Sequence, residues 1–132
     1  MRMMIETGAA ELAATRRTDR DLSELDRQLG LMRRAHAEGD VAAFVTADLA
    51  FHDVIFRAAD NRILIATMRP LTSMLEETRT ETSAVPSIRE HAIGEHTAIL
   101  EAMREGSTAG ARQAMRSHMR QTRDDLLHYV HG

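Results

Sequence analysis

The segment from Asp40 to Asn61 reads DVAAFVTADLAFHDVIFRAADN, and its apolar residues recur with the spacing of one helical stripe. The stripe comprises Val41, Phe44, Val45, Ile55, Phe56 and Ala59. Asp48 and His52 fall on the same stripe and, being four residues apart, stack on one face of the helix. A carboxylate on a buried face is costly unless a cation or hydrogen-bond donors compensate for its charge. The segment therefore predicts a helix that carries polar side chains into the core.

Two interpretations of the Asp48 and His52 pair are open. A single Asp or His on an apolar face is usually a core residue whose hydrogen bonds are satisfied. A carboxylate and an imidazole one helical turn apart also suit a metal ion. The positions of the other histidines on their helices decide between these two interpretations.

The composition favours helices within a single domain. The chain has 132 residues, of which 43% are hydrophobic, so it is long enough for one core and too short for two ordinary domains. It has only two prolines and seven glycines, and helix-forming residues are abundant. We therefore expect residues 1–132 to form one all-α domain.

The composition also excludes several classes of protein. Without cysteine the chain has neither a disulfide nor a thiolate ligand, so a transition metal must be held by His and carboxylate. No apolar run reaches the length needed to span a membrane, and Glu6 and Glu11 interrupt any signal-peptide pattern. The 17 basic and 20 acidic residues give a net charge of −3, the wrong sign for binding DNA. These features predict a cytoplasmic protein that does not itself bind DNA or a membrane.

Helix boundary signals divide the chain into further helices. A first helix is expected over residues 2–15, and its abrupt start at Met1 indicates that a preceding segment is missing. Thr18 and Asp21 form a capping box for a second helix over residues 19–38. Gly39 ends that helix and Asp40 caps the next, which predicts a tight antiparallel hairpin.

The second half of the chain predicts three more helices. The third helix should end around Ala59 to Asn61, where Asn tolerates the left-handed conformation. The fourth should begin near Arg62 with a kink at Pro70. The polar residues 78–87 are expected to form a loop. A fifth helix should then begin at Pro86 and end at Gly106, and Ser107 or Thr108 should cap the sixth.

Two more histidines interrupt apolar stripes. His96 lies in the middle of the stripe of the fifth helix, and His118 lies in the middle of that of the sixth. With Asp48 and His52 they make four metal-ligand residues on three apolar faces, which favours a metal site over four separate core residues. The remaining histidines lie off their stripes or near an end and are predicted to be solvated; they are His36, His91, His128 and His131.

Three imidazoles and one carboxylate suit tetrahedral zinc, and they would leave two positions open on octahedral nickel, manganese or iron. An open position would allow a metalloenzyme, a hydrolase or an oxygenase, that activates bound water. Against an enzyme, the HEXXH motif is absent and only Glu95, beside His96, is a nearby candidate for a general base. A purely structural helical bundle is a third possibility.

Several motifs in order resemble one known family. They are RMMIETGAAELAA at residues 2–14, D-L-A-F-H at 48–52 with A-x-x-N at 58–61, E-H-T-A-I-L at 95–100, and Gly106 followed by A-R-x-A-M-R-x-H-M at 111–119. Together they are similar to the C-terminal ligand-binding domain of FadR-type regulators (the FCD domain) in the GntR superfamily of bacterial transcription factors. The resemblance covers nearly the whole chain.

The resemblance implies an antiparallel bundle of about six or seven helices around a central cavity. In this family the positions of Asp48, His52, His96 and His118 hold a divalent metal, and a small organic acid completes its coordination. Arg2 and Arg79 are our candidates for the cation that binds the carboxylate of this effector.

The family also implies a sensor rather than an enzyme. Its members usually form homodimers through this domain and bind DNA through an N-terminal winged helix-turn-helix domain. Residues 1–132 contain no such domain, so we expect either a fragment of a longer regulator or a free-standing sensor domain.

Overall fold

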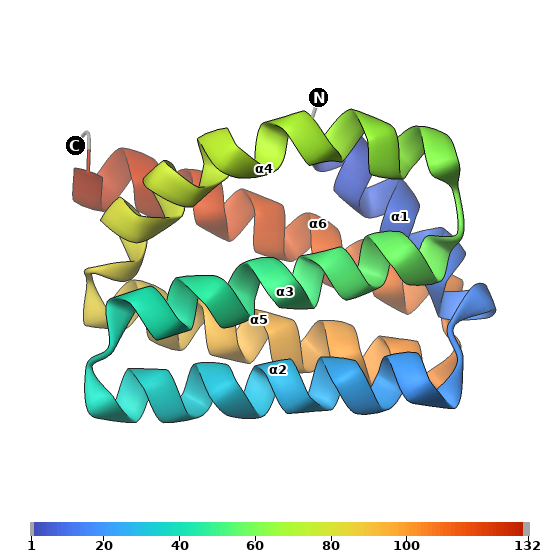
Figure 1. Ribbon diagram of the computed structural model, residues 1–132, viewed down its shortest axis with the longest axis horizontal. Helices are drawn as coiled ribbons and strands as arrows, with labels where there is room; N and C mark the ends of the chain where they lie inside the picture. The colour runs from blue at the N-terminus through green and yellow to red at the C-terminus, as the bar shows by residue number, and fades with distance from the viewer. Residues whose placement is uncertain (1, 131–132) are drawn as a thin grey trace.

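The computed structural model describes residues 2–130, which form six α-helices and a short π-helical turn. The helices are α1 (Arg2–Arg16), α2 (Asp19–Glu38), α3 (Val41–Ala59), α4 (Arg62–Ser83), α5 (Pro86–Glu105) and α6 (Thr108–Asp125), and the turn is η1 (Leu126–Val130). Helix α3 packs against α1, α2 and α4, while α5 packs against α2 and α6 (Figure 1). The described residues contain no strand, which confirms the all-α prediction, and none of their helices is long and apolar enough to cross a membrane.

The hairpin between α2 and α3 has the boundaries that the sequence predicts. The Thr18 hydroxyl accepts a hydrogen bond from the N–H of Asp21, and the Asp21 carboxylate accepts one from the N–H of Thr18, at 3.1 and 3.0 Å. Gly39 ends α2 in the left-handed region with φ 68°, and Asp40 caps α3. This confirms the capping box and the tight turn.

Helix α3 ends at Ala59, within the range that the sequence predicts, but the residue predicted to be left-handed is wrong by one position. Asp60 takes the left-handed conformation with φ 52°, whereas Asn61 is extended. The Asn61 side chain instead accepts hydrogen bonds from the N–H groups of Ile63 and Leu64. An Asn with extended backbone is a strong N-cap, so Asn61 begins α4 and does not end α3.

The loop predicted over residues 78–87 is also wrong, because α4 continues to Ser83 and α5 begins at Pro86. The Thr82 hydroxyl donates hydrogen bonds to main-chain carbonyls of the preceding turn, and Thr82 and Ser83 are buried. Burial against the bundle therefore outweighs the weak helix propensity of this threonine-rich stretch. Helix α4 also passes through Pro70 as one helix.

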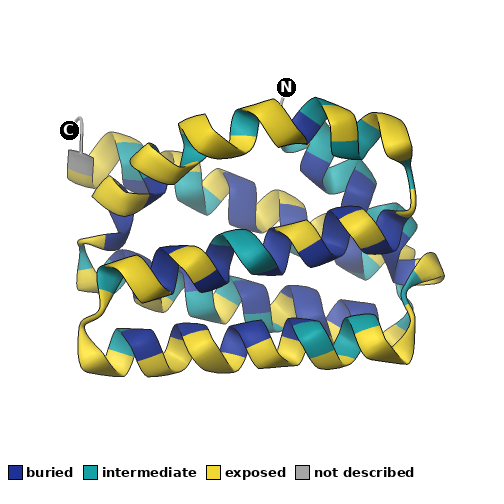
Figure 2. Ribbon diagram, in the orientation of Figure 1, coloured by how far each residue is buried: buried dark blue, intermediate teal, exposed yellow. Residues whose placement is uncertain are grey.

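The core lies between α1, α2, α3, α5 and α6. Its largest fully buried side chains include Phe44, Phe51, Leu29, Ile99 and Met115. Helix α1 contributes a row of buried alanines, whose small side chains let it pack closely against α3 and α6. In contrast, α4 is exposed over most of its length, as the yellow segments in Figure 2 show. Helix α4 therefore covers the bundle from outside.

A buried arginine holds the end of α4 to the rest of the bundle. Arg89 donates one hydrogen bond from Nε to His36 Nδ1, at 2.9 Å, and one from Nη1 to the main-chain oxygen of Ser83, at 2.7 Å. His36 is half-buried, so its prediction as a solvated residue is wrong. Because the last carbonyls of a helix have no partner within the helix, Arg89 supplies one from α5.

Replacing Arg89 with Met keeps most of the apolar stem but removes both donors. We expect the free energy of unfolding to fall by about 1–3 kcal/mol, since the buried oxygen of Ser83 loses its partner. The control is Arg34→Met, whose ion pair with Glu38 is exposed and should contribute less than about 1 kcal/mol. Urea unfolding followed by circular dichroism measures both, and equal losses would contradict a structural role for Arg89.

Candidate metal centre

The structure brings together all four residues that the sequence predicts as metal ligands. Asp48 and His52 come from α3, His96 from α5 and His118 from α6, and each side chain is buried. One candidate ligand atom from each lies within 4.8 Å of the others. The spacing of four residues places the α3 pair on one face, and the antiparallel packing of α5 and α6 brings the two histidines opposite it.

The distances among the four side chains suit a small cation. The Nε2 atom of His96 lies 2.8 Å from Asp48 Oδ1, and the Nε2 atom of His52 lies 3.5 Å from the same oxygen. The Nε2 atoms of His118 and His52 are 3.3 Å apart. Donors at the corners of a tetrahedron around zinc are about 3.3 Å from one another, given ligand distances of about 2.0 Å. The cluster can therefore hold a metal ion.

Each imidazole has a hydrogen-bond acceptor on its other nitrogen. His52 Nδ1 donates to Glu6 at 2.5 Å, His96 Nδ1 donates to the main-chain oxygen of Ala92 at 2.7 Å, and His118 Nδ1 donates to Glu95 at 2.6 Å. A proton held on Nδ1 leaves a lone pair on Nε2, the nitrogen that faces the cluster. This is the arrangement that supports histidine ligands in metal sites.

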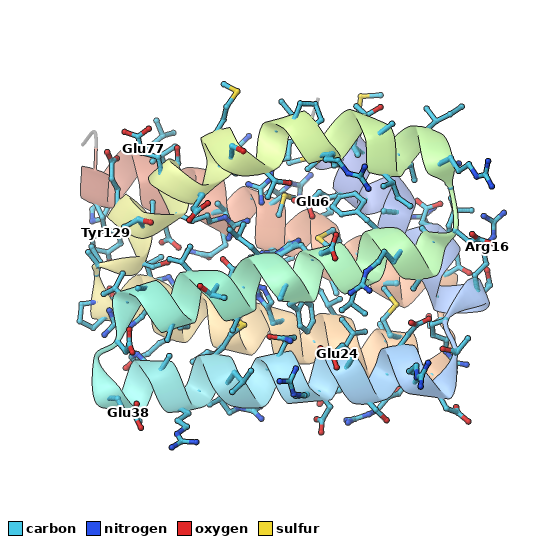
Figure 3. All side chains as sticks on the ribbon, in the orientation of Figure 1. Glu6, Arg16, Glu24, Glu38, Glu77 and Tyr129 are labelled. Atoms are coloured by element: carbon cyan, nitrogen blue, oxygen red, sulfur yellow. The ribbon has the colours of Figure 1, made fainter. Side chains whose placement is uncertain are left out.

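Glu6 is a functional residue that the sequence analysis did not assign. Its side chain is buried, and Figure 3 shows it in the interior of the bundle, unlike Glu38 at the end of α2. A signal was present, because Glu6 precedes Ala9, Ala10 and Ala13 at helical spacing and so shares their buried stripe. Glu6 links α1 to the centre through its contact with His52.

Arg79 binds Asp48 directly, which the sequence could not show. Its Nη1 donates to Asp48 Oδ2 at 2.8 Å, while Nε and Nη2 are buried without a hydrogen-bond partner among the described residues. A small cavity of about 20 Å³ adjoins it, lined also by hydroxyl side chains such as Thr82, Ser83 and Thr122. Two donors of Arg79 therefore adjoin a polar space that is about large enough for one water molecule.

Arg2, the other candidate arginine, lies beside Glu6 rather than beside Asp48. Its Nε is 2.8 Å from Glu6 Oε2, and its side chain is 24% exposed. Arg2 also lines a larger cavity of about 490 Å³ between α1, α3 and α4, where Glu6 and His52 form part of the wall. The two candidate arginines therefore contact different carboxylates, Arg79 at Asp48 and Arg2 at Glu6.

Charges around the centre keep its inner carboxylates ionised. Burial alone would raise the pKa of Asp48, but the charge of Arg79, followed by the contacts with His52 and His96, lowers that pKa well below its ordinary value. Burial likewise opposes ionisation of Glu6, yet the contacts with His52 and Arg2 lower its pKa to about 2. Asp48 can therefore serve as a charged ligand near neutral pH.

Burial is the largest cause of the pKa shifts of two further residues, Glu95 and His118. Burial, followed by the nearby charge of Asp125, raises the pKa of Glu95 to about 8. Burial and the neighbouring His96 and His52 lower the pKa of His118 well below its ordinary value. A neutral His118 has the free lone pair that a metal requires.

The remaining histidines lie outside the cluster, but not all are solvated. The His91 side chain is 39% exposed, in line with its prediction as a solvated residue, but its Nδ1 also lies 3.1 Å from the buried carboxylate of Asp125. A carboxylate that is buried needs partners, and Asp125 has His91 on α5 and Gln121 on its own helix, which donates to it at 3.0 Å. His128 is exposed as predicted, and His131 lies outside the described residues.

Asp48→Ala should destabilise the protein strongly even in the presence of a chelator, because it leaves Arg79 buried and unpaired. We expect a loss of about 3–5 kcal/mol in the free energy of unfolding. The matched control is Asp53→Ala on the same helix, whose exposed ion pair with Arg57 should contribute less than about 1 kcal/mol. Chemical denaturation compares the two variants, and similar stabilities would show that Asp48 does not compensate Arg79.

Comparisons with known proteins agree with this fold. The chain is 32% identical over 134 residues to the HTH-type transcriptional regulator LutR of Bacillus subtilis (strain 168), covering 98% of this chain and 60% of LutR. It is 32% identical over 122 residues to the putative L-lactate dehydrogenase operon regulatory protein of Escherichia coli (strain K12), covering 89% of this chain and 46% of that protein. This chain therefore spans about half the length of these curated relatives.

A solved structure and a family profile complete the comparison. The E. coli protein McbR/YncC superposes with a TM-score of 0.69 at 22% identity, over 93% of this chain and 64% of that one, which supports the helical fold. The profile of the FCD domain family matches residues 1–121. The chain therefore belongs to the FCD domain family of GntR-type transcription regulators.

Proposed function

We propose that this domain is a metal-dependent sensor of small organic acids in a transcription regulator. One observation carries the proposal: four buried side chains direct three Nε2 atoms and one carboxylate oxygen toward a common point, and each imidazole is oriented by a hydrogen bond on Nδ1. Such a set is costly to bury without a cation, because the facing lone pairs repel one another. In this proposal Asp48, His52, His96 and His118 are the metal ligands.

Zinc is the metal that the donor set favours. Three neutral imidazoles and one carboxylate are its usual ligands in sites without cysteine, and the distances among the donors suit a tetrahedral ion. Nickel, manganese and iron are the alternatives, since an octahedral ion would keep two positions for oxygen ligands. The carboxylate of an effector would supply those oxygens.

The charges around the centre support an anionic effector. A divalent cation with one carboxylate and three neutral imidazoles keeps a net positive charge, which favours a bound anion in a buried site. Arg79 adds two free donors beside the cavity. A hydroxy acid or a dicarboxylate could coordinate the metal at one end and pair with Arg79 at the other. L-lactate is one such hydroxy acid, and a relative is named for a lactate dehydrogenase operon.

The regulatory role rests on the family and on the length of its relatives. The relatives named as regulators are longer than this chain, and we propose that a winged helix-turn-helix domain occupies the part that this chain does not cover. Effector binding would change the helix packing of a cytoplasmic homodimer and so change how paired DNA-binding domains meet a twofold operator. DNA contact would come only through that second domain.

The structure gives less support to the metalloenzyme alternative. Glu95, the candidate general base from the sequence, accepts the hydrogen bond of His118 Nδ1 and so orients a ligand. A general base must reach the proton of a metal-bound water. Glu95 instead contacts Nδ1 of His118, the ring nitrogen that faces away from the cluster. Its position favours support of the metal centre over catalysis.

Replacing His96 or His118 with Ala should abolish metal retention, because each residue supplies a quarter of the donor set. Wild-type protein exposed to zinc and then desalted should retain a single ion per chain, and metal should raise its melting temperature. The control is His128→Ala, which changes an exposed histidine. Elemental analysis measures occupancy, and full occupancy in both ligand variants would show that the ligand set is wrong.

The second prediction concerns the effector. L-lactate and small dicarboxylates should bind zinc-loaded protein measurably in calorimetry but should not bind protein stripped with a chelator. In zinc-loaded protein, where the metal itself compensates the charge of Asp48, Arg79→Met should weaken acid binding by at least about tenfold, whereas the exposed Arg57→Met should have no effect. Equal affinity for loaded and stripped protein would remove the metal from sensing.

A further inference from the structure

The cavity of about 490 Å³ between α1, α3 and α4, which we call the side cavity, meets the candidate metal centre only at His52. The Nε2 atom of His52 faces His118 within the cluster, at 3.3 Å. Its Nδ1 atom contacts Glu6, and Glu6 also lines the side cavity. The side cavity is therefore separate from the atoms that would bind a metal ion.

The size of the side cavity suits a small organic molecule. Its volume lies within the range of about 300–1,000 Å³ that is usual for small-molecule sites. In contrast, the polar space beside Arg79 has only about 20 Å³. Organic molecules larger than lactate therefore fit the side cavity but do not fit the space beside Arg79.

Much of the cavity wall is apolar. Phe56 and Met68 are buried in this wall, and Ile65 and Leu75 of α4 are half-buried in it. Removing partly exposed apolar side chains from water is favourable, and a bound ligand would do so. The wall therefore favours a ligand with an apolar body over one that is polar throughout.

Two buried polar atoms of the lining residues have no hydrogen-bond partner among the described residues. They are Arg2 Nε and Glu6 Oε2, which lie 2.8 Å apart but are not aligned for a hydrogen bond. The other oxygen of Glu6 accepts the hydrogen bond of His52. A buried donor and a buried acceptor without partners are costly, so a group that both accepts and donates would stabilise this pair. A hydroxyl group does both.

The charged residues of the lining favour an anion. Glu6 pairs with Arg2, and Asp53 pairs with Arg57 at 3.0 Å. Arg69 has no ion pair within the described part of the chain, so the three arginines exceed the two carboxylates by one charge. Arg69 is exposed, whereas Glu6 is buried. The unpaired positive charge therefore lies toward solvent, and the unsatisfied pair of Arg2 and Glu6 lies in the interior.

We propose that the side cavity binds an acid that has an apolar body and a hydroxyl group remote from its carboxylate. The hydroxyl donates to Glu6 Oε2 and accepts from Arg2 Nε. The apolar body covers the wall formed by α3 and α4, and the carboxylate pairs with Arg69. None of these contacts uses a metal ion. The side cavity is thus a second ligand site that does not rest on the proposed function.

A ligand in this site would also join α4 to the two helices beneath it. Between Arg62 and Thr78, the only buried residue of α4 is Met68, which lines the side cavity. A ligand that contacts α1, α3 and α4 together adds contacts to this loosely held part of α4. Binding should therefore raise the melting temperature of the chain.

Calorimetry with the zinc-free chain tests the class of ligand. In a series of ω-hydroxy acids from hydroxybutyrate to hydroxydecanoate, we expect the best member to bind zinc-free and zinc-loaded protein with equal affinity. The fatty acid of the same length lacks the hydroxyl and the diol lacks the carboxylate, so each should bind at least about tenfold more weakly. Lactate has no apolar body and should not bind the zinc-free protein.

Two variants test the location of the site. Arg69→Gln should remove the preference for the hydroxy acid over the diol, whereas Arg62→Gln on the same helix should retain it, since Arg62 does not line the cavity. Ala50→Leu fills the cavity from α3 and should weaken binding by about tenfold or more. The control is Ala42→Leu at an exposed position of α3. Circular dichroism checks that both leucine variants are helical, and Arg69→Gln changes an exposed residue that the fold does not need.

Several results would overturn the assignment. Equal affinity for the hydroxy acid and the fatty acid would exclude the role of Arg2 and Glu6, and binding that requires zinc would exclude a separate site. Wild-type affinity in both Arg69→Gln and Ala50→Leu, or no binding of any member of the series, would exclude the side cavity. Each of these results leaves metal retention and metal-dependent binding of lactate untouched, so the two proposals fail separately.

Discussion

The ion pair between Asp48 and Arg79 is the interaction on which the interior of this domain depends. A lone ionised carboxylate in the core would be protonated or hydrated, and neither state gives a rigid metal ligand. Arg79 keeps Asp48 charged, and it does so from α4, which otherwise covers the bundle loosely. The same contact therefore maintains the ligand and holds the covering helix over the centre. Glu6 has the equivalent role on the opposite side, where it joins α1 to His52.

Sequence periodicity predicts the four candidate metal ligands well, but it predicts poorly the residues that contact them. Each of these ligands interrupts an apolar stripe, and such an interruption can be recognised from the sequence alone. They are Asp48, His52, His96 and His118. Glu6 shares a stripe with alanines, which are too small to mark a buried face clearly. The partner of Arg79 could not be predicted, because contact between α3 and α4 side chains depends on the crossing of the two helices and not on spacing within either.

In the fold, too, features set by neighbouring residues are predicted from the sequence, whereas features set by contacts between helices are not. Caps such as Thr18, Gly39 and Gly106 depend on neighbouring residues, so their positions follow from the sequence. The continuation of α4 to Ser83 depends on burial and on Arg89 from the next helix, which local propensity does not contain. The contacts of His36 and His91 could not be predicted for this reason, since their partners come from other helices.

The residues of the candidate metal centre come from widely separated helices, so the centre can form only late in synthesis and folding. Its residues extend from Glu6 on the first helix to His118 on the last, so no emerging fragment contains a complete set. Helix α6 is synthesised after the other five helices, and His118 can join the other candidate ligands only when α6 packs between α1 and α5. Folding must wait for contacts that are distant in the sequence, which slows the final step relative to formation of the local α2 and α3 hairpin. Binding of the proposed cation would therefore be a late event that depends on completion of the bundle.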